Sequence, residues 1–521
     1  MSKLSEMTYK GPIKEKSREL FWRHAVESLT SQRRNNRILN KEYLRRLWEY
    51  SFFKCLPGED HNDYILNDWL AFSDLSYGEK TPEQLKIVFL CGPEPENDVK
   101  VLLRLGVRIE NIFAIEKDKD TFKKAIDSLA KTYPTLKIFK GGIESFVAAY
   151  PIKFDIIYLD YTASLLAKVV DASFAKVIFA DSLEDLSVLA INTCCPSFDD
   201  PNIDIFIKTI SNYLFYQECI EYATLHDEEN DGRFIESPCD NYEEVVFQEL
   251  IRENLGNAYS TYQTSFISNI LCIIKPFNSV INTPELRKRL FSDNEKIRDI
   301  MKEFSRNEDT YMDPAMYPLY HPFSAETGTY REIKSNGEEF SIQEITSLIY
   351  PFLDASYNDN KEFLSNSVNS VLPEFENNFI GYQKGRFNAF CDVPTPSLLL
   401  ELAIYQLGHP YHINMNNHKR WSYTDKTRTM YMDIFTVDKC RALYDWLPMI
   451  EYYPNNLHNK ERQIITRMCI DAIKKHLHYF IPRQFYGSAL IGINEEEWST
   501  NYEIPTRGRL KREEDSPDSE E

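Results

Sequence analysis

Short apolar segments alternate with amphipathic segments between residues 85 and 191, and this alternation is the clearest pattern in the chain. Each apolar segment predicts a buried strand, because it is short and flanked by turn residues or acids. The stretches between them repeat apolar residues at helical spacing, as Val99, Leu102 and Leu103 do. Strands that alternate with helices in this way predict parallel βαβ units and a doubly wound sheet. The predicted strands are 86–91, 111–115, 136–139, 154–159 and 187–191.

The sequence on either side of this α/β segment predicts a different organisation. Apolar residues recur at helical spacing within 12–75, which predicts N-terminal helices. Residues 261–274 (TYQTSFISNILCII) contain two runs rich in β-forming residues, so we expect an antiparallel hairpin there that closes the sheet. The expected parts are a helical region at 1–84, an α/β domain at 85–277, a mostly helical region at 278–510 with helices such as 398–407 and 461–477, and a disordered acidic tail at 511–521.

Composition narrows the class of protein. The ten cysteines form no C-x-x-C pair, which favours reduced thiols and a cytoplasmic protein. The chain has no apolar signal segment at its start and no apolar run long enough to span a membrane, so we expect no membrane partner. A net charge of −20 opposes sequence-independent binding of nucleic acid, although residues 1–50 carry an excess of Lys and Arg.

Polar residues stand where four of the predicted strands end. In open α/β sheets, the crevice outside the carboxyl ends of the strands binds ligands. An acid after the second strand can accept both hydroxyls of a ribose, and an acid after the third can accept the amine of a base. An acid in a first helical turn also has a purely structural interpretation, because it offsets the helix dipole. The candidates are Gly92 and Glu94 after the first strand, Glu116 after the second, Glu144 after the third, and Asp160 with Tyr161 after the fourth.

The order of elements, the acid that ends the second strand and the expected terminal hairpin resemble a class I (Rossmann-like) SAM-dependent methyltransferase over residues 85–277. Family members usually carry several glycines after the first strand, where this chain has Gly92 followed by Pro93 and Glu94. Such an acidic loop repels a pyrophosphate but tolerates a sulfonium and an ammonium group, so the residues favour S-adenosylmethionine over NAD. The resemblance implies cofactor binding by Gly92, Glu94, Glu116, Glu144 and Asp160, and catalysis by Asp160 and Tyr161.

Two motifs are similar to the reaction motifs of particular methyltransferases. Asp160 and Tyr161 stand where amino-methyltransferases of bases carry D/N-P-P-Y/F, but the prolines are missing. Cys194, in the element NTCCPS at 192–197, is similar to the T-C-S element of RNA cytosine-C5 methyltransferases, whose thiolate attacks the base. A buried structural thiol is the competing interpretation, and we favour it.

One segment near the C-terminus, 409–428, interleaves cations with aromatic residues in an otherwise acidic chain. This composition is typical of single-stranded nucleic-acid surfaces, on which bases stack. We therefore expect a substrate-binding surface for single-stranded RNA or for a protein partner; the alternative is a loop packed on the α/β domain. The segment also holds His409, His412 and His418, but no spacing suited to a metal, and we expect none. The expected binding residues are Lys419, Arg420, Trp421 and Tyr423.

These patterns predict a SAM-binding methyltransferase that transfers a methyl group to RNA or to another macromolecule. The alternative is a binding or assembly protein that uses the same fold without catalysis, because a fold does not by itself establish a function.

Overall fold

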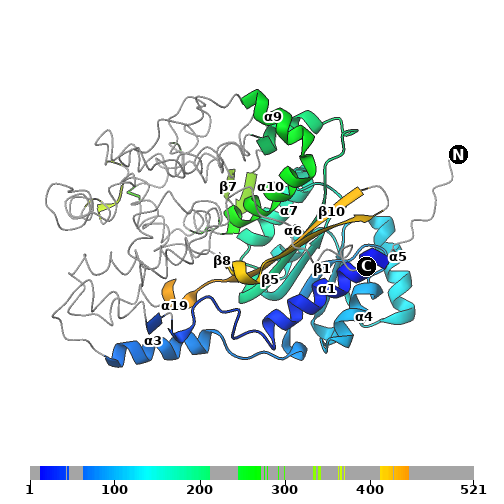
Figure 1. Cartoon of the computed structure of the whole chain (residues 1–521). Helices are drawn as coiled ribbons and strands as arrows, with labels where there is room; N and C mark the ends of the chain where they lie inside the picture. The colour runs from blue at the N-terminus through cyan, green and yellow to red at the C-terminus, as the bar shows by residue number, and fades with distance from the viewer. Residues whose placement is uncertain are drawn as a thin grey trace.

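The computed structural model describes residues 12–42, 44–45, 63–211, 244–271, 332–335, 338–341, 411–425 and 428–444, with single positions between 275 and 369. The expected helices at 398–407 and 461–477 and the acidic tail at 511–521 lie outside the described residues. The described part is built around one large sheet with helices on both of its faces (Figure 1). No helix in this part is long and apolar enough to cross a membrane.

The protein has an α/β architecture with a mixed, mostly parallel sheet of eight strands, in the order β3-β2-β1-β4-β5-β10-β8, with β9 paired to β10. Strands β1 to β5 are mutually parallel, and β10 runs antiparallel to β5. All five predicted strands are confirmed. The strands are β1 (Ile87–Leu90), β2 (Ile112–Glu116), β3 (Lys137–Lys140), β4 (Phe154–Asp160), β5 (Leu183–Cys194), β8 (His412–Ile413), β9 (Lys419–Asp425) and β10 (Arg428–Asp438). A separate hairpin contains β6 (Glu332–Ser335) and β7 (Glu338–Ser341).

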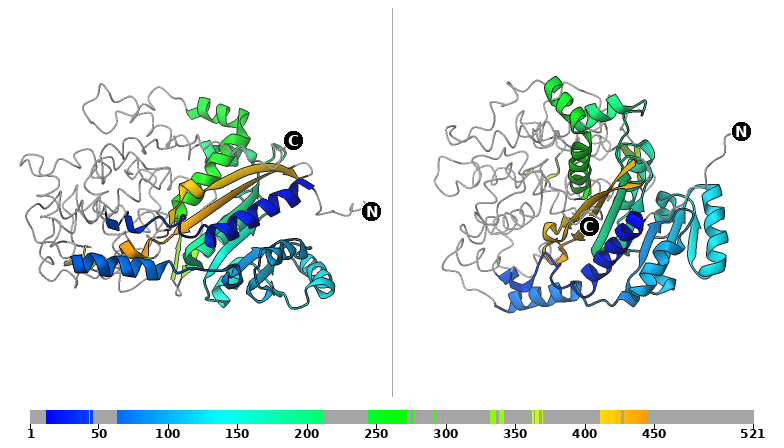
Figure 2. Two further views of the ribbon diagram at one scale, coloured as in Figure 1. Left: turned by 60° about the horizontal axis from the view of Figure 1, so that its bottom comes forward. Right: turned by 45° about the vertical axis from the view of Figure 1, so that its right-hand side comes forward.

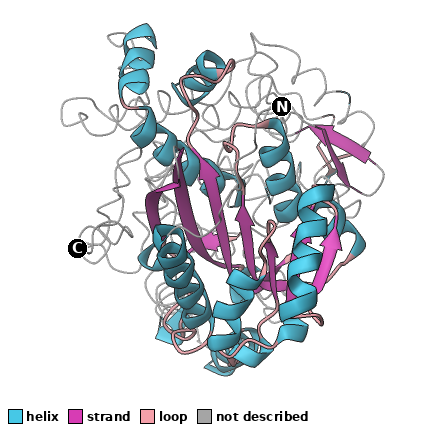
Figure 3. Ribbon diagram, turned by 90° about the vertical axis from the view of Figure 1, so that its right-hand side faces the viewer, coloured by secondary structure: helices cyan, strands magenta, loops and turns pink. Residues whose placement is uncertain are grey.

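Helices connect the parallel strands along the chain and pack on both faces of the sheet (Figure 3). Helix α5 shows how the sequence sets a boundary, because the Asp118 carboxylate accepts a 2.8 Å hydrogen bond from the Thr121 amide and so caps the helix. The helices are α1 (Pro12–Leu29), α3 (Asp63–Ser76), α4 (Glu96–Arg104), α5 (Lys119–Thr132), α6 (Ile143–Ala149), α7 (Lys168–Phe179), α9 (Glu244–Glu253), α10 (Leu255–Asn269) and α19 (Arg441–Tyr444), with short 3₁₀ turns at η2 (Pro82–Gln84), η3 (Ile109–Asn111) and η10 (Met415–Asn417).

The antiparallel strands of the sheet come from residues 412–438 and not from the hairpin expected at 261–274. The prediction of a hairpin at 261–274 is wrong, because α10 covers most of this segment. The residues beside β5 belong instead to β10, which pairs with it from Met430↔Cys194 to Asp438↔Leu186. The sheet therefore takes strands from 411–438, beyond the expected range 85–277, and the region 278–510 contributes strands as well as helices.

Helix α10 owes its conformation to polar contacts with the sheet. The Thr264 hydroxyl donates to Asp433 Oδ1 at 2.9 Å, and Gln263 Nε2 donates to Asp433 Oδ2 at 2.7 Å. The hydroxyl of Tyr259, on the same helix, lies 2.6 Å from the hydroxyl of Thr193 on β5. The threonines and aromatics that favour a strand locally therefore hold a helix against β5 and β10, which illustrates how tertiary contacts override intrinsic propensity.

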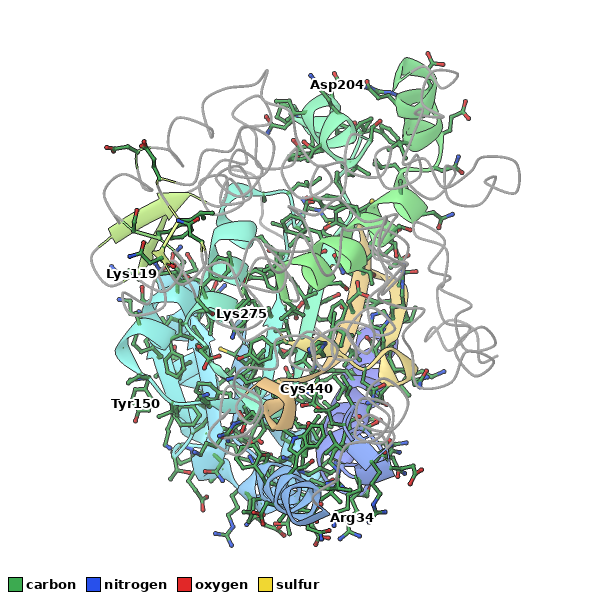
Figure 4. The ribbon with its side chains drawn as sticks, turned by 90° about the vertical axis from the view of Figure 1, so that its left-hand side faces the viewer. Arg34, Lys119, Tyr150, Asp204, Lys275 and Cys440 are labelled. Carbon is green, nitrogen blue, oxygen red and sulfur yellow. The ribbon has the colours of Figure 1, made fainter. Side chains whose placement is uncertain are left out.

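At the opposite end of the sheet from the carboxyl ends of the parallel strands, Asp181 joins the α7–β5 connection to the C-terminal strands. Its carboxylate accepts hydrogen bonds from Lys153 Nζ at 3.1 Å, Lys439 Nζ at 3.0 Å and Tyr411 Oη at 2.8 Å. Lys275 Nζ lies 3.5 Å from the same carboxylate (Figure 4). Burial raises the pKa of Asp181, but the three lysines outweigh it and hold this pKa well below its usual range.

The N-terminal helix α1 packs along the sheet beside the β9–β10 hairpin (Figure 2). Its aromatic residues are fully buried, with the Phe21 and Trp22 rings 4.4 Å and 5.6 Å from that of Tyr158 on β4. The ring of His24 on the same helix contacts the carbonyl oxygen of Asn417 at 3.2 Å. Burial lowers the pKa of His24 to about 4, since the contact with Asn417, which opposes the shift, is the weaker effect.

His24 should therefore make stability depend on pH. The pKa of His24 is lower in the folded than in the unfolded chain, so its contribution is complete above about pH 6.5 and is lost as the pH falls toward 4. A shift of this size corresponds to as much as about 3 kcal/mol. We expect His24→Gln, whose amide can still donate to Asn417, to remove this part of the loss of stability at acid pH. Urea unfolding from pH 7.5 to 4 measures the difference, and parallel curves for the two proteins would contradict it.

Candidate functional site

A cavity of about 330 Å³ opens at the carboxyl ends of β1, β2, β3 and β4. Its volume falls within the range of roughly 300–1,000 Å³ that is usual for small-molecule sites. All six residues predicted from the strand ends line it: Gly92, Glu94, Glu116, Glu144, Asp160 and Tyr161. They meet because the strands are parallel and neighbouring, so that the residues after each strand share one edge of the sheet.

Glu116 ends β2 and lies at the centre of this edge. Its Oε1 accepts a 2.8 Å hydrogen bond from the Asp118 amide, and the Gly92 amide is also directed at the carboxylate. Gly92 has a φ of +59°, a conformation that glycine adopts without strain, and this turns the loop after β1 toward Glu116. Burial raises the pKa of Glu116, although the amide groups around it oppose the shift. The carboxylate is thus fixed in direction and half-buried, as a group that accepts two hydroxyls of a ligand should be.

Strand β4 lies on the other side of β1 from β2. It ends at Asp160, and Tyr161 follows it. Asp160 Oδ1 accepts a 2.8 Å hydrogen bond from Asn192 Nδ2, and Asp160 Oδ2 lies 4.0 Å from Lys14 Nζ. The hydroxyl oxygen of Tyr161 lies 2.7 Å from that of Ser173 on α7. A carboxylate and an aromatic ring therefore stand next to each other at the edge of the cavity.

Helix α1 supplies two cavity residues that the sequence analysis missed, Lys14 and Arg18. Arg18 Nε donates to Asp98 Oδ1 at 3.0 Å, and the Trp22 indole donates to the same oxygen at 2.8 Å. Burial raises the pKa of Asp98, although Arg18 and Trp22 oppose this shift. The sequence shows an excess of basic residues in 1–50 and the i, i+4 spacing of Lys14 and Arg18. It does not show their acidic partners, Asp160 and Asp98, which are 80 or more residues away.

The two remaining acids contact the walls of the cavity. Glu94 Oε2 accepts a 2.9 Å hydrogen bond from Asn97 Nδ2. Glu144 Oε1 lies 3.3 Å from Lys117 Nζ, and its side chain folds back over Gly142, where any larger residue would collide with it. Both acids also stand before or within the first turn of a helix, so the structural interpretation holds beside the ligand-binding one.

The N-terminus of α4 does not offer a site for phosphate. The first amide groups of the helix already donate to carbonyl oxygens, those of Asp98 and Val99 to Pro95 and that of Asn97 to Glu94. In the dinucleotide-binding loops that use a helix N-terminus, such amides face the pyrophosphate instead. Glu94 adds negative charge to the same wall, whereas the Asp98 carboxylate is paired with Arg18. The start of α4 is therefore unlike the amide-lined loops that hold a pyrophosphate.

The expected substrate surface at 409–428 is contradicted by the structure where it is described. Arg420, Trp421 and Tyr423 lie on β9 with 3–4% of their surface exposed, and Lys419 beside them is half-buried. The Trp421 indole donates to Ser17 Oγ of α1 at 2.8 Å, and the Tyr423 hydroxyl accepts from Asn192. Arg420 donates to Ser260 of α10. Arg420, Trp421 and Tyr423 hold the layers of the protein together, so bases cannot stack on these three side chains. The segment is packed, as the alternative expects, but as a strand of the sheet and not as a loop.

The second motif for a reactive group, Cys194, is also a structural residue. Its side chain is buried and its Sγ donates to the Cys195 carbonyl oxygen at 3.3 Å. Burial raises the pKa of Cys194, although Arg428 opposes this, so the thiol is disfavoured as a nucleophile. Among the described residues, no group of three or more His, Cys, Asp or Glu could hold a metal ion. His418 contacts Asp433 at 3.0 Å in the interior, and His409 lies outside the described residues.

Comparison with known proteins places the chain in no family. No family model matches it, and no curated protein is detectably similar to it in sequence. The function has to be inferred from the chemistry of the cavity.

The burial of Trp421 leads to a test that separates a structural role from a binding role. We expect Trp421→Ala to lower the free energy of unfolding by about 3–5 kcal/mol, because it leaves a large void between β9 and α1. Phe198→Ala is the control, since Phe198 is 59% exposed and its loss should change stability by less than about 0.5 kcal/mol. Urea unfolding measures both. A stable Trp421→Ala protein that has lost retention of RNA would restore the surface interpretation.

Proposed function

We propose that the protein binds S-adenosylmethionine in the cavity at the strand ends and acts as a methyltransferase. The observation that carries the proposal is the fixed Glu116 carboxylate at the end of β2, in one cavity with Gly92 and Asp160. The strand order β3-β2-β1-β4-β5 supports it, because a Rossmann-like sheet has the same order and binds its ligand where the connections from its first strand diverge.

The residues of the cavity fit the chemical groups of this cofactor. Glu116 accepts the two ribose hydroxyls, a pairing of one carboxylate with two donors that is stronger than neutral hydrogen bonds. Asp160 accepts a hydrogen bond from the ammonium group of the cofactor's amino-acid tail. Lys14, whose Nζ lies 4.0 Å from Asp160, attracts the carboxylate of the same tail. The cofactor carries no phosphate, which agrees with the Glu94 carboxylate and the engaged amides at the start of α4.

The chain's own residues would contribute position more than chemistry. When bound, the cofactor supplies an electrophilic methyl group, and the transfer needs chiefly an acceptor atom held in line with it. Tyr161 at the edge of the cavity is placed to hold an acceptor through its ring, beside the Asp160 carboxylate. RNA as the acceptor loses its support with the burial of β9, so the acceptor is proposed only as a macromolecule.

The first test is calorimetric titration with S-adenosylmethionine and its demethylated product. We expect Glu116→Ala to weaken binding about 100-fold, because two charge-assisted hydrogen bonds are lost, and Glu116→Gln to weaken it less. Glu110→Ala is the matched control, since Glu110 is an exposed acid near the other end of β2 and should leave affinity unchanged. NAD should not bind. No binding of either nucleoside by the unmodified protein at millimolar concentration would refute the proposal.

A second candidate function is a protein that binds the cofactor without transferring its methyl group. The observation that favours it is the loop after β1, in which Gly92 is followed by Pro93 and acids.

Incubation with methyl-labelled cofactor and cellular RNA or protein distinguishes the two functions. If the protein is an enzyme, label should enter one of these fractions, and Asp160→Asn should reduce the rate by roughly 100-fold or more. Cofactor binding that depends on Glu116, without any transfer of label, would establish the second function instead.

A further inference from the structure

Two successive hydrogen bonds link Asp160 on β4 to side chains on β5 and β9, on the side away from the cavity. Asn192 on β5 stands directly opposite Asp160 on β4 in the register of the sheet. Asn192 Nδ2 donates to Asp160 Oδ1 at 2.8 Å and also to the hydroxyl oxygen of Tyr423 at 2.8 Å. Tyr423 belongs to β9, and its side chain is buried in the core. The two amide hydrogens of Asn192 are therefore used to join β4 to β9.

This arrangement leaves the other polar atom of Asn192 without a partner. Asn192 is fully buried, and within the described part of the chain its Oδ1 accepts no hydrogen bond. A buried acceptor without a partner costs about 1–3 kcal/mol, so the fold satisfies this amide only in part. Both hydrogens of the amide are used, and of the two groups that receive them Asp160 is the one that lines the cavity.

The hydrogen bond determines which oxygen of Asp160 meets a ligand. Oδ1 is engaged by Asn192, whereas Oδ2 lies on the side of Lys14, 4.0 Å from its Nζ. Asp160 lines the cavity and Asn192 does not. Asn192 consequently acts on the cavity only through the orientation of the neighbouring carboxylate.

We infer that Asn192 is a positioning residue that holds the Asp160 carboxylate for the ammonium group of the ligand's amino-acid tail. The inference rests on the proposed function, because it needs a ligand with a nucleoside and such a tail. It assigns a role in binding to a fully buried residue on β5, one strand away from the cavity. Tyr423 supports the same role from β9 by fixing the second hydrogen of the amide.

The experiment compares two ligands that differ in the tail. S-Adenosylhomocysteine carries the amino-acid tail, and 5′-methylthioadenosine has the same nucleoside without it. We expect Asn192→Leu to weaken binding of S-adenosylhomocysteine by about 10-fold or more, the loss of one hydrogen-bonded orientation to a charged group. Binding of 5′-methylthioadenosine should change by less than a factor of two. The urea midpoint should fall, because the buried Tyr423 hydroxyl and the Asp160 carboxylate each lose a donor. Calorimetry and urea unfolding give the two readouts.

Asn414→Leu is the matched control for a buried amide. Asn414 is as inaccessible as a core residue, and its Nδ2 donates to the Asn36 carbonyl oxygen at 3.1 Å, away from the cavity. We expect this substitution to lower stability and to leave the affinity for both ligands unchanged. Both leucine variants should therefore lose stability, but only Asn192→Leu should lose affinity for the ligand that carries the tail.

Asn192→Asp keeps the shape of the side chain and tests the inference if the leucine variant fails to fold. Two carboxylates in contact repel each other at pH 8, but at lower pH they can share a proton and restore a hydrogen bond. The affinity of this variant for S-adenosylhomocysteine, relative to the unmodified protein, should recover between pH 8 and pH 6. The affinity for 5′-methylthioadenosine should stay constant relative to the unmodified protein.

The outcomes separate this inference from the proposed function. Three results would overturn the role of Asn192 alone. These are an unchanged affinity of Asn192→Leu for S-adenosylhomocysteine, equal losses of affinity for both ligands, and an affinity of Asn192→Asp, relative to the unmodified protein, that does not change with pH. Failure of the unmodified protein to bind either ligand would overturn both the role and the proposed function.

Discussion

The antiparallel pairing of β10 with β5 is the interaction on which the rest of the structure depends. Its register joins residues 430–438 to residues 186–194, more than 230 positions apart in the chain, along most of the length of both strands. Because β10 also pairs with β9 and β8, this one contact brings Trp421 to α1, Tyr423 to Asn192 and Asp433 to α10. Layers on both faces of the sheet are therefore anchored to strands from the C-terminal part of the chain.

The position of α1 connects this architecture to the cavity. The helix is held to the sheet by buried aromatic rings and to α4 by Asp98, which accepts hydrogen bonds from Arg18 and Trp22 with one oxygen. A buried carboxylate is costly unless it is paired and hydrogen-bonded, and here both conditions are met. The same helix carries Lys14 to Asp160. The cavity is thus closed by a segment that precedes the parallel strands in the chain, and its charge depends on that packing.

The chemistry of the cavity follows from how its acids are satisfied. Glu116 is oriented by backbone amides, Asp160 by a neighbouring strand, and Glu144 by Lys117. The Glu116 and Asp160 carboxylates act as hydrogen-bond acceptors of fixed direction, because the groups behind them restrict rotation, whereas the exposed Lys117 holds Glu144 less firmly. The amides at the start of α4 are already engaged, which removes the usual site for a phosphate. The proposed binding of a nucleoside with a charged tail rests on these constraints.

The sequence alone determined the five parallel strands and the residues at their ends. Apolar runs flanked by turns report burial directly, and parallel strands align their carboxyl ends, so Gly92, Glu116 and Asp160 could be placed in one site without coordinates. Only the tertiary structure decided which segment closes the sheet, because β-forming residues in α10 and cations in β9 are satisfied by distant partners such as Asp433 and Ser260. The roles of Lys14, Arg18 and Asn192 likewise depend on contacts across the sheet, and a local pattern of polar and apolar residues carries no information about them.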